Sequence, residues 1–287
     1  MTAKEPSRGD KKRLRAHFGF THMPFSKYAW ARHMFDSVSQ RELLHGLVMW
    51  TEVGGIALVP GPTGVGKSIT LRRFVEELDD TRFRIIHFTQ LPTTVTGFLR
   101  SLNRELGLPM RLHTADLFDQ AHKHLATHEQ ERGTHPLLII DDAEGIHTAV
   151  ADTLRRLTSY ELNGEDRFSI VLAGTEDLLG VLLQPALAPL CSRIFYAHPL
   201  RPFGLEDARN YIRYHLDRAD VDPKTLTDDA VRRVFQASHG TPRLINQLCL
   251  QALIQGAVLG RVAIDGDFMA AVIKAHPLFQ NGRGARR

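Results

Sequence analysis

Short apolar runs alternate with amphipathic segments along the first 200 residues of the chain. The runs have the length of buried strands, whereas the segments between them repeat apolar residues every three or four positions, as helices do. Strands that are separated by helices cannot pair as hairpins, so they need crossover connections and form a mostly parallel sheet. The predicted strands are Gly55–Pro60, Ile85–Phe88, Leu137–Ile140, Ser169–Ala173 and Ile194–Tyr196.

This pattern predicts an α/β fold, with a five-stranded parallel sheet covered by helices on both faces. Ser39 and Glu42 have the spacing of a capping box and are expected to start a helix before the first strand. The other helices expected around the sheet are Ile69–Leu78, Val95–Leu106, Ala115–Thr127 and Ala149–Leu162.

Beyond Pro202 the strand pattern ceases and only helical periodicity remains. Thr227 stands at a preferred N-cap position, and Pro242 stands at a first helical position. The segment therefore predicts a small helical domain appended to the sheet. Its expected helices are Leu205–Arg218, Thr227–Ser238, Thr241–Leu259 and Asp265–Ala275.

With 43% hydrophobic and 24% charged residues among 287, the chain has a globular composition, which excludes a disordered chain or a fibrous rod. Its apolar runs stop after about four residues, far short of the ~20 that span a bilayer. Residues 1–15 lack the apolar centre of a secretory signal. We therefore expect a cytoplasmic protein without a membrane segment. Cys191 and Cys249 form no paired motif, which indicates reduced thiols.

Basic residues are concentrated at both ends. Residues 1–15 carry six basic and two acidic groups, and residues 274–287 carry four basic groups and no acidic one. Because the formal net charge of the chain is +4, residues 16–273 carry −4. Basic arms beside an acidic body fit an electrostatic grip on nucleic acid, since each neutralised phosphate releases counterions. Arms that only aid solubility are the alternative.

A phosphate-binding motif lies between the first predicted strand and the next helix. It consists of Gly61, Pro62, Thr63, Gly64, Val65, Gly66, Lys67 and Ser68, followed by Ile69. The glycines allow backbone N–H groups to converge on an anion, and the helix presents its positive dipole end. Lys67 is expected to reach the β- and γ-phosphates, and the Ser68 hydroxyl to ligate Mg²⁺.

Three carboxylates follow the strand Leu137–Ile140. Asp141 is expected to hold Mg²⁺ directly or through water, as a strand-end acid does in P-loop enzymes. Asp142 is the candidate for orienting and polarising the attacking water, and Glu144 is its rival. The alternative for Asp142 is an N-cap before a helix at Ala143–His147.

Phosphoryl transfer is catalysed mainly by positioning and positive charge, which makes three further residues candidates. Thr175 closes the fourth predicted strand with a hydroxyl suited to sensing the γ-phosphate or holding the attacking water. Arg193 precedes the fifth strand and is a candidate arginine finger for a neighbouring subunit, with a surface arginine as the alternative. Arg243 stands in the first turn of a capped helix, from which it is expected to reach the nucleotide phosphates; a solvated arginine is the alternative.

Together these motifs resemble the AAA+ class of P-loop ATPases, and more narrowly its ExeA-like group, over roughly Phe18 to Ala275. The similar segments are Phe18-Gly19-Phe20, Pro24-Phe25-Ser26, the phosphate loop, Leu138–Glu144, Ala173-Gly174-Thr175, Arg193 and Gly240–Arg243. The resemblance implies ATP hydrolysis with ATP and Mg²⁺, and a homo-oligomer that is a ring or a helical filament. It also implies four regions: a basic arm 1–17, an AAA+ domain 18–202, a helical lid 203–276 and a basic tail 277–287.

Two departures from the group refine this expectation. Its members carry Asp-Glu where this chain has Asp141-Asp142, so the presumed base is one methylene shorter and slow hydrolysis is expected. The secretion ATPase of the group continues into a membrane segment and a cell-wall-binding region, whereas this sequence ends shortly after its helical domain. This favours the stand-alone, transposition-associated members, similar to TniB, TnsC and IstB.

We therefore expect an ATP-dependent regulator that assembles on double-stranded DNA and recruits or activates a transposase, with slow hydrolysis as a release timer. No clear recognition helix is visible, so DNA contacts are expected to be to the backbone, with weak sequence specificity. Arg155 and Arg156 are candidates for this contact, and a solvated helix face is the alternative. The competing hypotheses are a cytosolic ExeA-like ATPase that assists a secretion or envelope assembly complex, and a nucleotide-binding switch without turnover.

Overall fold

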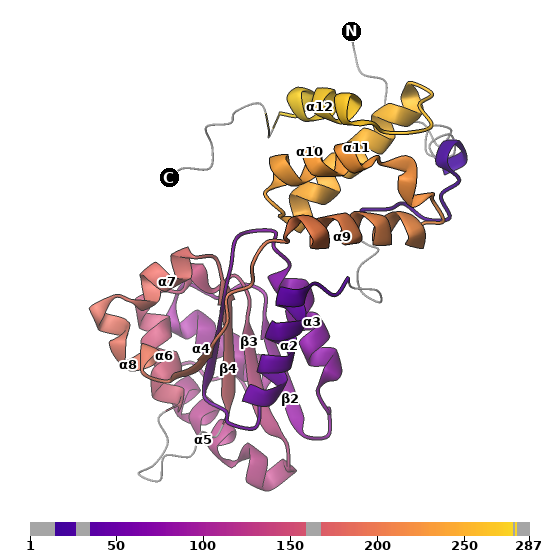
Figure 1. The fold of residues 1–287 in the computed structure, drawn as a ribbon. Coiled ribbons are helices and arrows are strands. Elements are labelled where there is room, and N and C mark those ends of the chain that lie inside the picture. Colours follow the sequence, from indigo (N-terminus) through magenta and orange to yellow (C-terminus); the bar gives the residue numbers. More distant parts are fainter. Residues whose placement is uncertain (1–14, 27–34, 159–167, 278, 280–287) are drawn as a thin grey trace. The chain divides into compact units, whose positions relative to one another are not determined.

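The computed structural model describes residues 15–26, 35–158, 168–277 and 279 (Figure 1). Most of the expected arm 1–17 and tail 277–287 lies outside these residues, as do residues 159–162 of the predicted helix Ala149–Leu162. The chain divides into two compact units, which are described separately. Residues 39–201 form the α/β unit, and the described residues up to 38 and from 202 onward form the helical unit.

A five-stranded sheet forms the centre of the α/β unit. The strand order is β2-β3-β4-β1-β5, and every neighbouring pair is parallel. The strands are β1 Ile56–Pro60, β2 Phe83–Phe88, β3 His135–Ile140, β4 Ser169–Gly174 and β5 Ile194–Ala197. All five predicted strands are present, so the predicted α/β fold with a parallel sheet is confirmed.

Alternate residues of the strands enter two hydrophobic cores, one on each face of the sheet. In β1, Ile56 and Leu58 belong to one core, and Ala57 and Val59 belong to the other. Because both faces are covered, the central strands β1 and β4 are buried along their whole length, whereas β2 carries Arg84 and His87 and β5 alternates half-buried and exposed residues. The helices of the first core are α4 Val95–Glu105, α5 Thr114–Arg132, α6 Thr148–Thr158, α7 Asp177–Leu182 and α8 Ala188–Cys191. Those of the second core are α2 Val38–Trp50 and α3 Lys67–Glu77.

Two features of these helices differ from the sequence prediction. The capping box at Ser39 is wrong, because α2 begins at Val38 and the Ser39 hydroxyl instead accepts a hydrogen bond from the N–H of Arg201 at 3.2 Å. No helix was expected where α7 and α8 lie, since helices of six and four residues are too short to show periodicity. Within the described residues, no helix is both long enough and apolar enough to cross a bilayer.

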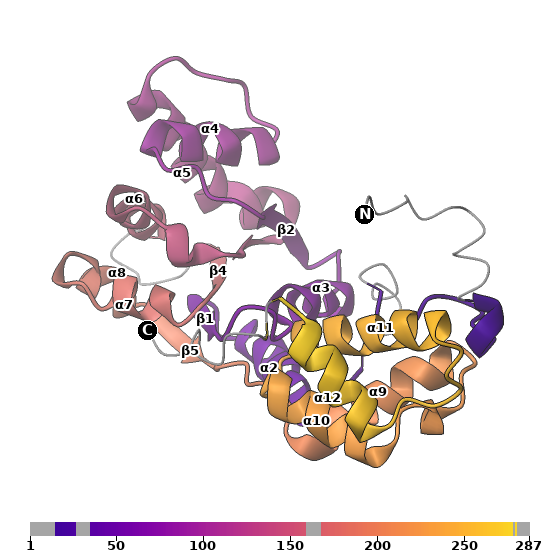
Figure 2. The ribbon, with the colours of Figure 1, turned by 90° about the horizontal axis from the view of Figure 1, so that it is seen from above.

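In the described part of the helical unit, the helices that follow residue 202 pack around one core (Figure 2). They are α9 Leu205–Arg218, α10 Asp228–Ser238, α11 Pro242–Val258 and α12 Gly266–Ala275, so all four predicted helices are present. Phe20 and Phe25 are buried in this core, only 5% and 3% exposed. The structure therefore groups them with the helical unit, whereas the boundary expected at residue 18 placed them in the AAA+ domain.

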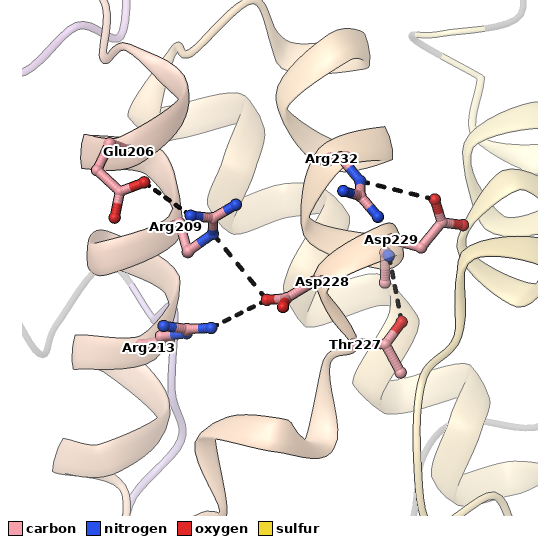
Figure 3. A network of polar contacts seen from close by, with 8 residues as sticks. Glu206, Arg209, Arg213, Thr227, Asp228, Asp229 and Arg232 are labelled. Carbon is pink, nitrogen blue, oxygen red and sulfur yellow. Dashed lines mark hydrogen bonds and ion pairs between the residues drawn. The ribbon is translucent and has the colours of Figure 1, made fainter.

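Polar contacts join the first two helices of this unit (Figure 3). The predicted N-cap of α10 is confirmed: the Thr227 hydroxyl accepts a hydrogen bond from the N–H of Ala230 at 3.3 Å. Asp228 accepts a hydrogen bond from Arg213 of α9 at 2.9 Å and lies 4.0 Å from Arg209. These side chains are partly exposed, so each ion pair contributes at most about 1 kcal/mol.

Candidate active site

The sheet brings three candidate segments to one edge. The loop 61–66 follows β1, Asp141 follows β3 and Thr175 follows β4, and these strands are neighbours in the order β3-β4-β1. Because parallel strands all end at the same edge of a sheet, residues just after their carboxyl ends form one surface. The phosphate loop and the two polar side chains therefore lie on the same surface.

The loop has conformations and close approaches that favour glycine. Gly64 and Gly66 have φ values of 81° and 111°, in the left-handed region. A Cβ on Gly61 would come within 2.5 Å of the carbonyl oxygen of Leu200. The N–H of Gly61 donates to the carbonyl oxygen of Gly174 at 3.1 Å, which fixes the start of the loop to the end of β4.

Lys67 opens α3, and its ammonium group lies against the loop. The residue is buried, and Nζ donates to the carbonyl oxygens of Gly61 at 2.7 Å and Pro62 at 3.3 Å. A cation in this position is suited to charge-assisted hydrogen bonds with phosphate oxygens.

The first turn of α3 completes the cradle. The first intrahelical bond runs from the N–H of Thr70 to the carbonyl oxygen of Gly66 at 3.0 Å. The N–H groups of Lys67, Ser68 and Ile69 precede it, so they have no acceptor within the helix. These amides and the positive end of the helix dipole suit an anion. Ser68 is exposed, and its hydroxyl is accessible to a metal ion.

Asp141 and Asp142 follow β3 and differ in environment. Asp141 is buried, and its Oδ1 accepts a hydrogen bond from the N–H of Asp142 at 3.0 Å. Asp142 is exposed and has a φ of 50°, a left-handed conformation that Asp adopts more readily than most residues. A short 3-10 helix, Ala143–Gly145, follows, and the Asp142 side chain makes no capping hydrogen bond to it. The N-cap alternative therefore has no supporting contact.

Glu144 connects the turn after β3 to the end of β4. Its Oε2 accepts a hydrogen bond from the backbone N–H of Thr175 at 3.1 Å. The Thr175 hydroxyl oxygen is buried and has no hydrogen-bond partner among the described residues. A buried hydroxyl normally has a partner, so this oxygen marks a position where a ligand or a water is expected.

Arg193 lies at the amino ends of the strands, opposite to the end where the phosphate loop lies. Its carbonyl oxygen accepts a hydrogen bond from the N–H of Ile56, the first residue of β1, at 3.1 Å. A strand advances about 3.3 Å per residue, so about 16 Å of β1 separates this edge from the loop. The guanidinium donates to the carbonyl oxygen and the hydroxyl of Thr158 at 3.1 and 3.2 Å. The structure therefore does not bring Arg193 to the phosphate loop of its own chain.

Arg243 belongs to the helical unit. It is exposed in the first turn of α11, and no carboxylate of the described residues pairs with its guanidinium. Thr241 occupies the N-cap position but makes no side-chain capping bond, so the expectation of a side-chain cap is wrong here. Gly240 shapes the turn: its φ is 74°, and a Cβ would overlap the carbonyl oxygen of Phe203.

The two arginines considered for DNA contact both have partners within the chain. Arg155 donates to Asp152 at 2.9 Å, and the guanidinium of Arg156 lies over the Phe118 ring, 4.6 Å from its centroid. The prediction that Arg155 and Arg156 contact DNA stays a prediction, as does the alternative of a solvated helix face. Cys191 and Cys249 are free thiols, and burial raises the pKa of both.

Some residues that shape the loop carry no sequence motif. Gln40 of α2 is buried, and its Nε2 lies 3.0 Å from the position of a Cβ on Gly66. The sequence gives one indication of this role, which is that the polar Gln40 lies close to the apolar face of its helix. The carbonyl groups of Gly174 and Leu200 could not be identified, because any residue has a carbonyl group.

The donor set at this edge fits ATP and Mg²⁺. Residues 61–69 offer converging amides and one ammonium group to the phosphates. Ser68 and Asp141 offer the oxygen ligands that Mg²⁺ prefers. The Thr175 hydroxyl at the same edge is buried and has no hydrogen-bond partner among the described residues.

Comparisons with known proteins agree with this site. Residues 51–182 match the family model described as an AAA domain. General secretion pathway protein A of Aeromonas hydrophila is 28% identical over 272 residues, which cover 92% of this chain and 49% of that protein. The chain thus spans about half the length of this relative. The chain is thus similar to AAA-domain proteins, and with the loop geometry this similarity supports an ATPase that uses ATP and Mg²⁺.

Solved structures with the same fold include two ORC structures. ORC2 of Aeropyrum pernix, in ADPNP and ADP complexes, superposes with a TM-score of 0.65 at 14% identity, covering 88% of this chain and 71% of that one. Drosophila ORC bound to DNA has a TM-score of 0.64 at 14% identity, covering 95% and 67%. At such identities the likeness shows the fold alone.

Proposed function

We propose that the chain is a cytoplasmic AAA+ ATPase whose ATP-bound copies assemble and whose hydrolysis reverses the assembly. One observation carries the proposal: the loop 61–66, Asp141 and Thr175 lie together at the carboxyl edge of neighbouring strands. Titration calorimetry is expected to detect Mg-ATP binding by the purified protein, and Lys67→Ala to abolish it. Absence of nucleotide uptake by the wild type would contradict the proposal.

In the proposed reaction, the oxygen of a water forms a bond to the γ-phosphorus while the bond to the β–γ bridging oxygen breaks, which releases ADP and phosphate. Ser68 and Asp141 would hold Mg²⁺, which when bound would supply positive charge that neutralises the phosphate oxygens. Lys67 and the first amides of α3 bind the phosphates. Asp142 orients the water and accepts its proton, and the Thr175 hydroxyl bonds to the water or to the γ-phosphate.

Arg193 is proposed to act on the ATP of a neighbouring copy. Its position at the sheet edge away from its own loop supports a role between copies, for which its guanidinium must leave Thr158. Arg193→Ala and Asp142→Asn should each lose hydrolysis. A mixture of the two should regain part of it, because some interfaces then combine an intact Asp142 with an intact Arg193. Mixtures without recovered phosphate release would contradict action between copies.

We also propose that the assembled form binds double-stranded DNA through backbone contacts and recruits a transposase. The basic groups of residues 1–15 and 274–287 support the DNA contact. A mobility shift of duplex DNA is expected only with ATP, and it should weaken when residues 1–15 and 283–287 are removed. Equal retention with and without ATP would argue against this function.

A second candidate is an ATPase that assists a secretion or envelope assembly complex. The similarity to General secretion pathway protein A over 92% of this chain favours it. It differs from the first candidate in needing no DNA. ATP-dependent assembly of the full chain, measured by light scattering, with no DNA retention at any ATP concentration would select this candidate.

A further inference from the structure

We infer that Glu144 is a positioning residue that fixes the Thr175 hydroxyl relative to the turn that contains Asp142. In this reading its carboxylate does not act as the base that accepts the water proton. The inference rests on the proposed ATP hydrolysis and concerns how the same site is kept in shape.

The contact between Glu144 and the end of β4 is close and specific. Oε2 accepts the N–H of Thr175 at 3.1 Å, across 31 residues of sequence. A Cβ on Gly174 would come within 2.7 Å of the same oxygen, so glycine leaves the room that the carboxylate occupies. Glu144 is half-buried, which limits the alternative positions of its side chain.

This contact joins the two polar segments of the site to the phosphate loop. On one side, Glu144 belongs to the short helix Ala143–Gly145 that directly follows Asp142. On the other side, Gly174, next to Thr175, accepts the N–H of Gly61 at 3.1 Å. Two hydrogen bonds, linked by the backbone of Gly174 and Thr175, therefore connect the Asp142 turn through Glu144 and the end of β4 to the loop.

The position of the Thr175 hydroxyl depends on this contact more than that of any other group in the site. Its oxygen is buried without a hydrogen-bond partner in the described part of the chain, so the backbone must hold it in place until a ligand or water arrives. Glu144 fixes that backbone at the N–H of the same residue. Asp142, in contrast, is exposed and is the carboxylate that can face an entering water.

Two conservative substitutions distinguish the effect of the length of the Glu144 side chain from the effect of its charge. Glu144→Gln keeps the length and an acceptor oxygen but removes the charge, so kcat should stay within about threefold of wild type. Glu144→Asp keeps the charge but shortens the side chain by one methylene, so kcat should fall roughly 10- to 100-fold with little change in KM. A base would give the opposite order, because Gln cannot accept a proton and Asp can.

A second readout does not depend on activity. Hydrogen exchange of the Thr175 amide should be slow in wild type and in Glu144→Gln, and faster in Glu144→Asp. Fast exchange in wild type, or loss of hydrolysis in Glu144→Gln equal to that in Asp142→Asn, would overturn the inference. If wild type hydrolyses no ATP, the proposed function fails, and the exchange experiment still decides whether Glu144 holds the end of β4.

Discussion

Asp142 combines an exposed carboxylate with a left-handed backbone. Its φ of 50° directs the chain out of β3 into the 3-10 helix, and its amide donates to the preceding Asp141. Asn and Asp tolerate this conformation better than other residues with a Cβ. Substitution by Asn therefore tests the carboxylate without disturbing the turn.

Asp142→Asn should lower kcat for ATP hydrolysis by about 100-fold or more, because general base catalysis contributes of that order. The dissociation constant for ATP should remain within about threefold, since phosphate binding depends on other groups. Phosphate release under single-turnover conditions measures the first effect and calorimetry the second. An Asn variant that hydrolyses ATP like wild type would remove Asp142 from the mechanism.

At the scale of elements, the turn before α11 depends on the close packing of Gly240 against the backbone of Phe203. Gly240 and Gly260 both have positive φ, 74° and 67°. A Cβ on Gly240 would overlap the carbonyl oxygen of Phe203, whereas a Cβ on Gly260 would meet nothing within 4 Å. An Ala at either position would have to adopt a left-handed backbone conformation. Only the Ala at position 240 would also clash with the backbone of Phe203.

Gly260→Ala should lower the free energy of unfolding by about 1–2 kcal/mol, the cost of a left-handed Ala. Gly240→Ala should lower it by at least a further ~1–3 kcal/mol, because the backbone must also move away from Phe203. Urea unfolding followed by circular dichroism measures both. Equal losses in the two variants would show that the approach to Phe203 does not limit this turn.

The helix caps of this unit offer a second matched pair. The Thr227 hydroxyl accepts the N–H of Ala230 at the start of α10, whereas Thr241 makes no side-chain cap at the start of α11. Thr227→Ala is expected to cost about 1 kcal/mol of stability, and Thr241→Ala less than about 0.5 kcal/mol. A larger loss for Thr241→Ala in the same urea titration would contradict the assignment of the cap.

At the scale of the whole molecule, acid should weaken the helical unit before the carboxylates are protonated. Burial, with a smaller contribution from the charge of nearby His22, lowers the pKa of His215 from 6.5 to about 4. The ring packs against Phe25 and Tyr211, with centroids 5.3 and 4.5 Å away. Between these two pKa values the unfolded chain binds a proton that the folded chain does not, so stability falls as the pH drops from about 6.5 towards 4.

The loss attributable to His215 should reach about 2 kcal/mol at pH 5 relative to pH 7. His215→Phe keeps a ring of similar size and removes the titration. Urea unfolding of both proteins at the two pH values is the measurement. The wild type should lose more stability than the variant, and parallel losses would exclude His215 as the cause.

Local patterns were sufficient for the strands and the longer helices of this protein, but not for the short helices α7 and α8. The apolar runs predicted all five strands, and the helical spacing predicted α9 to α12, because both patterns depend on residues only two to four positions apart. The phosphate loop was equally visible, because its glycines adopt conformations that other residues avoid. The prediction failed for the cap at Ser39, where a tertiary contact to Arg201 replaces a local one.

The tertiary structure alone decided which side chains meet. Glu144 contacts Thr175 across 31 residues, and Arg193 contacts Thr158 across 35. The strand order β2-β3-β4-β1-β5 places Thr175 between the loop and Asp141. The parallel direction of β5 leaves Arg193, which precedes that strand, at the amino ends of the strands and away from the loop. Phe20 and Phe25 likewise joined the helical unit through burial, which no spacing in the sequence specifies. Sequence patterns report neighbours along the chain, whereas the site depends on neighbours across the sheet.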